Sequence, residues 1–358
     1  TEYRPQQKPE EDQPQSRLEV DTFSLIPAYS VTDFSLPVGP ELRLEFRRSN
    51  YPFKPAIDQS NTPVNQVAPR DQQDYILGVG WRCNLLATAA FDANGNVTIT
   101  DEDGAEYRYS HEGLPIVTGQ GEAAAAQASV SFPPEGGVDW IKKYGTVYRF
   151  RHQAAPAVYR LSTVSDANGN TLVWEYNAEQ FPTRIYCQAH PEIALTITYN
   201  QYHRVASVTG PSGTFNYQYS DSQSKGKYLL QVLAPAVPVA DFAEPELVVS
   251  QRPETSFDYE AETDLQGNKT YALTEVTDPA GASLSLLWRW GPKEGQLASR
   301  QSGRRVLSRL QSSDGIAEFA YTEWKYDRVA TKVVDTRGNT WNYEFGDPLP
   351  ESGSWLLL

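Results

Sequence analysis

The fold is decided by the stretch Val164-Ser-Asp166-Ala-Asn-Gly169-Asn-Thr-Leu-Val-Trp174-Glu-Tyr176. Aspartate at the first position of a turn can accept backbone N–H bonds, and the glycine three residues later supplies the positive φ of a tight turn. Beyond the glycine, residues two apart lie on one face of a strand, so Trp174 and Tyr176 share a face. The stretch therefore predicts a β-hairpin.

The same signal recurs along the chain with substitutions and at irregular spacing, which indicates a repeated unit. The predicted turns are Asp166 with Gly169, Asp278 with Gly281, Asp335 with Gly338, Asp101 with Gly104, and weaker copies that begin at Asp92 and Gly210. In a repeat architecture each unit packs on its neighbours. We therefore predict an all-β chain, a spiralling antiparallel sheet of repeated β-hairpins with few or no helices. A β-sandwich or a propeller with long polar loops is the alternative.

Composition along the chain suggests its organisation. The first part is rich in Pro, Gln and charged residues and has little to bury, so we expect it to be disordered. The predicted parts are a disordered leader (1–17), an N-terminal strand segment and loop (18–75), a repeat sheet (76–346) with insertions near 119–127 and 234–254, and a C-terminal tail (347–358).

The formal charge of the 358 residues is −14, which argues against nucleic acid or an anionic membrane as the main partner. The sequence contains no apolar run near the length of a membrane span, so we expect no membrane insertion by this segment. Aromatic residues make up 12% of the chain and include 21 tyrosines. Tyrosine suits an extended sheet that is wetted on at least one face.

The residue types that carry chemistry do not form a recognisable constellation. The candidates are four separated histidines (His111, His152, His190 and His203), two cysteines (Cys83 and Cys187) and the acidic run Asp101-Glu102-Asp103. Metal sites show closer ligand spacing, the acidic run falls at a hairpin turn, and the cysteines fit a disulfide or free thiols equally. We expect no cofactor, no metal and no catalytic residue, and we interpret the repeat aspartates as turn formers.

An ordered set of phrases resembles the opening of Rhs/YD-repeat proteins. It comprises Asp33, Phe34, Leu36, Pro37, Arg47 and Tyr51, then Gly78, Gly80 and Trp81, followed by Asp101 to Tyr109 and the Asp-x-x-Gly-Asn repeats. The resemblance covers about residues 30–346. It implies a long β-sheet that spirals into a hollow shell, without an active site in this portion. The family's C-terminal self-cleavage motif has no counterpart here.

In bacterial members of the family the shell typically encloses a toxin, delivered by a type VI apparatus or within Tc toxin complexes, and the teneurins are animal relatives. The resemblance thus implies a secreted or exported bacterial polymorphic-toxin protein whose partner is a toxin or other polypeptide cargo. Unpaired strand edges of such a sheet invite pairing with another shell chain or with a copy of itself. The competing hypothesis is a surface adhesion module that binds carbohydrate or protein through its Tyr and Trp side chains.

Overall fold

The computed structural model describes residues 15–21, 26–40, 42–50, 76–78, 80–102, 105–116, 128–220, 228–240, 248–263, 269–291, 304–313, 321–326, 330–334 and 340–344. Within these ranges the chain forms antiparallel strands and one short 3₁₀ turn at Lys143–Gly145, and no α-helix is present. The prediction of an all-β fold built from antiparallel hairpins is confirmed.

Four strands form an N-terminal sheet in the order β1 (Gln15–Asp21), β2 (Ile26–Pro37), β3 (Arg43–Asn50) and β4 (Trp81–Cys83). Strand β1 begins inside the segment 1–17 that was expected to be disordered. Strand β4 pairs with β3, so this sheet continues past the boundary expected at residue 75.

The remaining strands form a long antiparallel sheet, here called the wall, and one separate two-stranded sheet. The wall strands are β5 (Thr88–Phe91), β6 (Val97–Thr100), β7 (Glu106–Tyr109), β8 (Ser129–Ser131), β9 (Val138–Ile141), β10 (Val147–Ala155), β11 (Val158–Ser165), β12 (Thr171–Tyr176), β13 (Pro182–Cys187), β14 (Ala194–Tyr199), β15 (Val205–Gly210), β16 (Gly213–Tyr219), β17 (Leu229–Leu233), β20 (Glu254–Thr263), β21 (Lys269–Thr277), β22 (Ser283–Gly291), β23 (Arg304–Ser313), β24 (Tyr321–Tyr326), β25 (Ala330–Val334) and β26 (Thr340–Glu344). Strands β18 (Val237–Ala240) and β19 (Val248–Gln251) form the separate sheet within the predicted insertion at 234–254.

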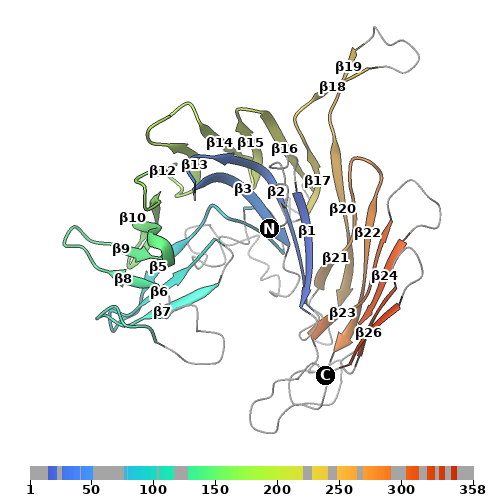
Figure 1. The fold of residues 1–358 in the computed structure, drawn as a ribbon, viewed down its shortest axis with the longest axis horizontal. Helices are drawn as coiled ribbons and strands as arrows, with labels where there is room; N and C mark the ends of the chain where they lie inside the picture. The colour runs from blue at the N-terminus through green and yellow to red at the C-terminus, as the bar shows by residue number, and fades with distance from the viewer. Residues whose placement is uncertain are drawn as a thin grey trace, which may run out of the picture.

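The wall is curved, and the N-terminal sheet lies on its inner side (Figure 1). At one end the wall forks, because one edge of β11 pairs with β12 through Thr163–Ser165 and with β5 through Val158–Arg160. At the other end, among the described strands, β26 pairs with β25 alone. One hydrophobic core joins the two layers and runs from Tyr29 in β2 to Leu286 in β22.

The predicted turn at Asp166 lies between β11 and β12. The Asp166 carboxylate oxygen Oδ1 accepts hydrogen bonds from the backbone N–H groups of Asn168 and Asn170, each at 2.9 Å, and Gly169 has a φ of 86°. The hydrogen bond from the Asn170 side-chain amide contributes most to lowering the pKa of Asp166 below its usual range, and backbone hydrogen bonds add to the effect. Asp92 and Asp278 make the same pair of backbone contacts two and four residues on.

Two further turns, both built on asparagine, have the same geometry and were missed from the sequence. Asn177 accepts from the N–H groups of residues 179 and 181, and Asn200 accepts from those of 202 and 204. The left-handed position is occupied by Gln180 (φ 71°) and His203 (φ 58°) instead of glycine. Both copies were missed because asparagine replaces the aspartate and a residue with a side chain replaces the glycine.

Asp101 lies in the β6–β7 turn, where its carboxylate accepts from the Ala105 N–H at 2.9 Å and from the Tyr107 hydroxyl at 3.2 Å. The predicted turn residues Gly104, Asp335 and Gly338, the motif residue Tyr51 and the insertion at 119–127 lie outside the described residues.

Neighbouring hairpins of the central wall pair over only part of the length of their strands. The hairpin β14–β15 pairs along most of its length, whereas β13 and β14 pair through only three residues each, Arg184–Tyr186 with Ala194–Thr196. Continuing that register would place Pro182 opposite Thr198, but the two strands are not paired there. Successive hairpins are therefore joined at one end and diverge at the other.

At four such points of divergence among the described strands, a tyrosine side chain spans the gap. Its hydroxyl donates to a backbone carbonyl of the neighbouring strand, as Tyr199 does to Pro182 at 2.7 Å. The full series, here called the bridging tyrosines, is Tyr176 to Leu161 (2.6 Å), Tyr199 to Pro182 (2.7 Å), Tyr219 to Val205 (2.8 Å) and Tyr259 to Leu229 (2.7 Å). Each bridging tyrosine directly follows a register shift within its hairpin, and the extra residue lies on the other strand of that hairpin.

These contacts explain the curvature of the wall. A β-bulge bends its strand and increases the local twist, so a bulge in every second strand bends the sheet in a regular way. Divergence of the strands would leave a buried carbonyl without its ladder partner, which costs free energy. The tyrosine hydroxyl replaces the missing backbone N–H. Repetition of the bulge and the bridging tyrosine thus produces a curved sheet without orphaned carbonyls at these positions.

Replacing Tyr199 by Phe should lower the free energy of unfolding by about 1–3 kcal/mol, because the Pro182 carbonyl loses its buried donor. Urea unfolding would measure the change. Tyr202→Phe is the matched control, since the Tyr202 hydroxyl makes no hydrogen bond with described residues, and it should change stability by less than about 0.5 kcal/mol. Equal effects of the two substitutions would contradict the bridging role.

Alkaline pH should unfold the protein cooperatively. Burial raises the pKa of Tyr176, Tyr199, Tyr217, Tyr219 and Tyr259. A tyrosine in the unfolded chain loses its proton at about pH 10, whereas the buried tyrosine of the folded protein keeps it. Below that pH the stabilisation from each buried tyrosine is therefore complete. Above it, each should remove about 1.4 kcal/mol of stability per pH unit. Tyrosinate absorbance from these residues should rise only together with unfolding; titration inside a folded protein would contradict this.

Candidate functional site

The residues of the N-terminal motif and the repeats of the wall meet at the contact between the two sheets, here called the inter-sheet core. Its centre is a buried ion pair in which Arg48 Nε of β3 lies 2.9 Å from Asp33 Oδ2 of β2, with the two side chains 2% and 1% exposed. The Tyr217 hydroxyl, from β16 of the wall, donates to the same Asp33 oxygen at 2.7 Å. A charged pair of one sheet thus makes a hydrogen bond to the other.

The Arg48 guanidinium also lies against aromatic rings from both sheets. Its central carbon is 5.4 Å from the ring centroid of Trp81 in β4 and 5.3 Å from that of Phe257 in β20. The Trp81 indole N–H donates to the hydroxyl of Tyr259 at 2.7 Å, and that hydroxyl donates to Leu229. One of the bridging tyrosines is therefore fixed by the N-terminal sheet.

Apolar contacts complete the inter-sheet core on either side of the ion pair. Phe34 packs edge-on against Phe215 with centroids 4.9 Å apart, and Phe46 packs against Tyr217 at 5.7 Å. Gly210 is required beside Phe34, because a Cβ there would lie 2.7 Å from the phenylalanine ring. Aromatic pairs of this kind stabilise an interface beyond the area that they bury.

The turn that follows β2 sits on a repeat turn. A Cβ at Gly39 would lie 2.3 Å from the Asn170 amide nitrogen and 2.7 Å from an Asp166 carboxylate oxygen, so the two turns are in direct contact. Asp166 is buried under this contact. The repeat turn thus serves both its own hairpin and the docking of the N-terminal sheet.

The remaining motif residues have structural contacts. The Arg47 backbone N–H donates to Asn84 Oδ1 at 2.8 Å. Gly78 and Gly80 have φ values of 86° and 80° and form the turn in which the N–H of buried Trp81 donates to the Gly78 carbonyl at 3.2 Å. Leu36 packs on the core and Pro37 is exposed.

The chemistry of this centre favours a structural role over acid–base work. Burial disfavours the charge of Arg48, but the adjacent Asp33 carboxylate outweighs burial and raises the pKa of Arg48. Burial, then the negative charge of Asp33, also raises the pKa of Tyr217. The carboxylate is occupied by the guanidinium and by the hydroxyl, and both groups are removed from water. The arrangement can fix the position of one sheet on the other.

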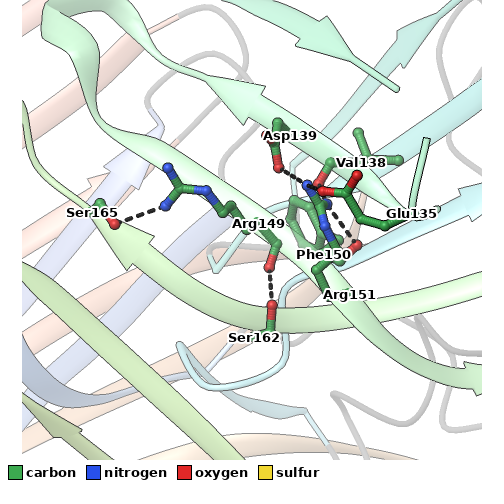
Figure 2. A network of polar contacts seen from close by, with 8 residues as sticks. All are labelled: Glu135, Val138, Asp139, Arg149, Phe150, Arg151, Ser162 and Ser165. Carbon is green, nitrogen blue, oxygen red and sulfur yellow. Dashed lines mark hydrogen bonds and ion pairs between the residues drawn. The ribbon is translucent and has the colours of Figure 1, made fainter. Parts of the chain in front are cut away.

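A second polar network cross-links strands at the other end of the wall (Figure 2). Arg149 and Arg151 flank the buried Phe150 on β10. Arg149 Nη1 donates to Ser165 Oγ of β11 at 2.8 Å, while Arg151 Nη2 lies 2.5 Å from an Asp139 oxygen of β9. These arginines hold neighbouring strands together, and sequence reasoning did not single them out.

The separated histidines and cysteines remain apart from one another. His203 pairs with Glu179 at 2.9 Å, which links two repeat turns, and His152 stacks on Tyr176 with centroids 4.3 Å apart. Both cysteines are buried free thiols, and burial raises the pKa of Cys83 to about 12. In the part of the chain that the structure describes, no three His, Cys, Asp or Glu side chains are grouped to hold a metal ion.

Among the residues that the structure describes, no helix is long and apolar enough to cross a membrane. Most aromatic rings whose burial is described are buried or half-buried. Among the residues whose side chains are described, the exposed large hydrophobic group includes one aromatic residue, Tyr144, with 73% exposure at the β9–β10 turn. The exposed large hydrophobic residues described there therefore include no cluster of aromatic rings.

No protein-family model matches the sequence, and no curated protein matches it. Solved structures that resemble the chain include a crystal structure of TcdB2-TccC3-TEV, at 11% identity and a TM-score of 0.25, over 89% of this chain and 17% of that one. A Photorhabdus luminescens Tc holotoxin pore with a TccC3 mutation matches at 11% identity and a TM-score of 0.25, over 89% and 16%. The chain spans less than a fifth of the length of either.

Replacing Arg48 by Met should destabilise the protein by about 3–5 kcal/mol, because Asp33 is left as an unpaired buried charge. The triple variant Arg48→Met, Asp33→Leu, Tyr217→Phe removes all three polar partners and should recover most of that loss. Chemical denaturation of both variants would measure this. A triple variant less stable than Arg48→Met alone would show that the ion pair itself is a net source of stability.

Proposed function

We propose that the chain is a non-enzymatic wall segment of an Rhs/YD-repeat type shell that encloses a toxin or another polypeptide. The observation that carries the proposal is the series of bridging tyrosines, which curves a row of hairpins in a regular way. A curved row of similar hairpins can be lengthened by adding further hairpins of the same kind, because each hairpin contacts its neighbours. Such a sheet suits a container.

The polar groups that most resemble catalytic candidates are occupied in holding this wall. Asp166 and Asp278 bind the N–H groups of their own turns. Asp33 and Arg48 bind each other between the two sheets. Asp166, Asp33 and Arg48 are also buried, so a substrate in solvent does not reach them. This supports a structural function over an enzymatic one.

The resemblance of the N-terminal motif and repeats to the Rhs/YD family supports the further details of the proposal. They are export from a bacterium, delivery of a polymorphic-toxin cargo by a type VI or Tc-like system, and edge pairing with another shell chain or a copy of the same chain. The strand β26 offers such an edge among the described strands, since it pairs with β25 alone.

Encapsulation can be tested with the complete gene product that contains this chain, produced together with the polypeptide encoded immediately downstream. The expected result is co-purification of a cargo that resists trypsin, whereas the same cargo produced alone is digested. The Arg48→Met variant should weaken protection, and Tyr202→Phe should leave it intact. Digestion of the cargo at equal rates with and without the shell would overturn the proposal.

A further inference from the structure

The two-stranded sheet β18–β19, here called the arm, projects from the wall on the side away from the N-terminal sheet (Figure 1). Its strands read Val-Pro-Val-Ala and Val-Val-Ser-Gln and carry no charged residue. Among the described strands neither one pairs with any other element. An isolated two-stranded hairpin is marginally stable in water, and edges without charged residues lack the usual protection against strand addition.

The base of the arm is firmly attached to the wall. The Ala234 N–H donates to the Pro253 carbonyl at 2.8 Å, which closes the insertion. The Arg252 side chain donates to the carbonyls of Ala234 at 3.0 Å and Thr214 at 2.8 Å. The arm is thus held in position from its base.

The two edges of the arm differ. Pro238 in β18 has no N–H group, and proline is one of the devices that block strand addition at an edge. Strand β19 contains no proline. It leads directly into a groove of about 400 Å³ between the base of the arm and the β21–β22 turn. An added strand would therefore pair with β19 and continue toward this groove.

The charge of the groove indicates the kind of strand that fits. Its lining includes Gln251, Arg252, Glu254, Asp278 and Pro279. Both carboxylates are exposed, although Asp278 Oδ1 also accepts from the N–H groups of its own turn. Arg252 Nε and Nη2 donate to backbone carbonyls. The groove lining thus carries two carboxylates and one guanidinium, which leaves an excess of one negative charge. Complementary charge favours a basic partner.

We propose that the arm is a docking site for an extended, basic polypeptide segment, which adds as a strand to β19 and places a lysine or arginine in the groove beside Glu254 and Asp278. This site lies on the arm and does not rest on the shell function. It combines two recognition devices: backbone hydrogen bonds supply the attachment, and the groove carboxylates select the charge.

The test uses the full chain and fluorescent synthetic peptides of alternating valine and threonine with two central lysines, two central glutamates or a central proline. The lysine peptide should bind about tenfold more tightly than the glutamate peptide. The proline peptide should not bind, because it interrupts the strand pairing. Equal binding of the lysine and glutamate peptides, or no binding of the lysine peptide, would overturn the proposal.

Two variants locate the site. Replacing residues 237–251 by Gly-Ser-Gly keeps the Ala234–Pro253 bond and Arg252, so the urea midpoint should be unchanged while binding of the lysine peptide is lost. Glu254→Gln should weaken that peptide about threefold, and the matched control Glu192→Gln, at the exposed β13–β14 turn, should not. Undiminished binding after excision of the arm would overturn the proposal. So would dimerisation of the intact chain that disappears on excision, because the arm would then serve a second copy.

Discussion

The curved wall depends on one recurring hydrogen bond, from a buried tyrosine hydroxyl to the carbonyl that diverging strands leave unpaired. In a flat antiparallel sheet, the backbone N–H and C=O groups of each strand are paired with those of its neighbours. Where two strands diverge, some of these groups lose their partners. Tyrosine solves this because its ring fills the space between the strands and its hydroxyl reaches the carbonyl. Tyr199 and Tyr219 do this in successive hairpins. Phenylalanine would fill the same space but leave the carbonyl without a donor.

The N-terminal sheet adds a second constraint, because a curved sheet with one apolar face must cover that face. Apolar packing alone would tolerate several positions of one sheet on the other. The ion pair between Arg48 and Asp33 allows fewer positions of the two sheets, since Asp33 must also accept the hydrogen bond from the Tyr217 hydroxyl. The indole of Trp81 is similarly tied to Tyr259. Buried polar groups of this kind favour one register at some expense of stability.

Sequence alone could predict the hairpins wherever the turn kept both aspartate and glycine, as at Asp166 and Asp278, because those two residues act locally. It missed the turns at Asn177 and Asn200, where the tertiary contacts of Gln180 and His203 support a left-handed residue other than glycine. The family motif placed Asp33 and Trp81 among important residues without indicating that they meet the wall. Such contacts join residues far apart in the chain, so no local pattern reveals them. The pairing of β4 with β3 escaped prediction for the same reason.

The same design explains where the wall can accept additions. Between Tyr219 and Tyr259 the series of bridging tyrosines continues across the arm, with β17 paired to β20 through Gln231–Leu233 and Glu254–Ser256. The insertion therefore leaves the repeat intact, because its ends meet at the Ala234–Pro253 bond before the short pairing begins. Curvature is set at one end of the hairpin, and the arm enters at the other. Because the two ends are separate, a new surface can be added at the joined end without a change in the contacts that bend the wall.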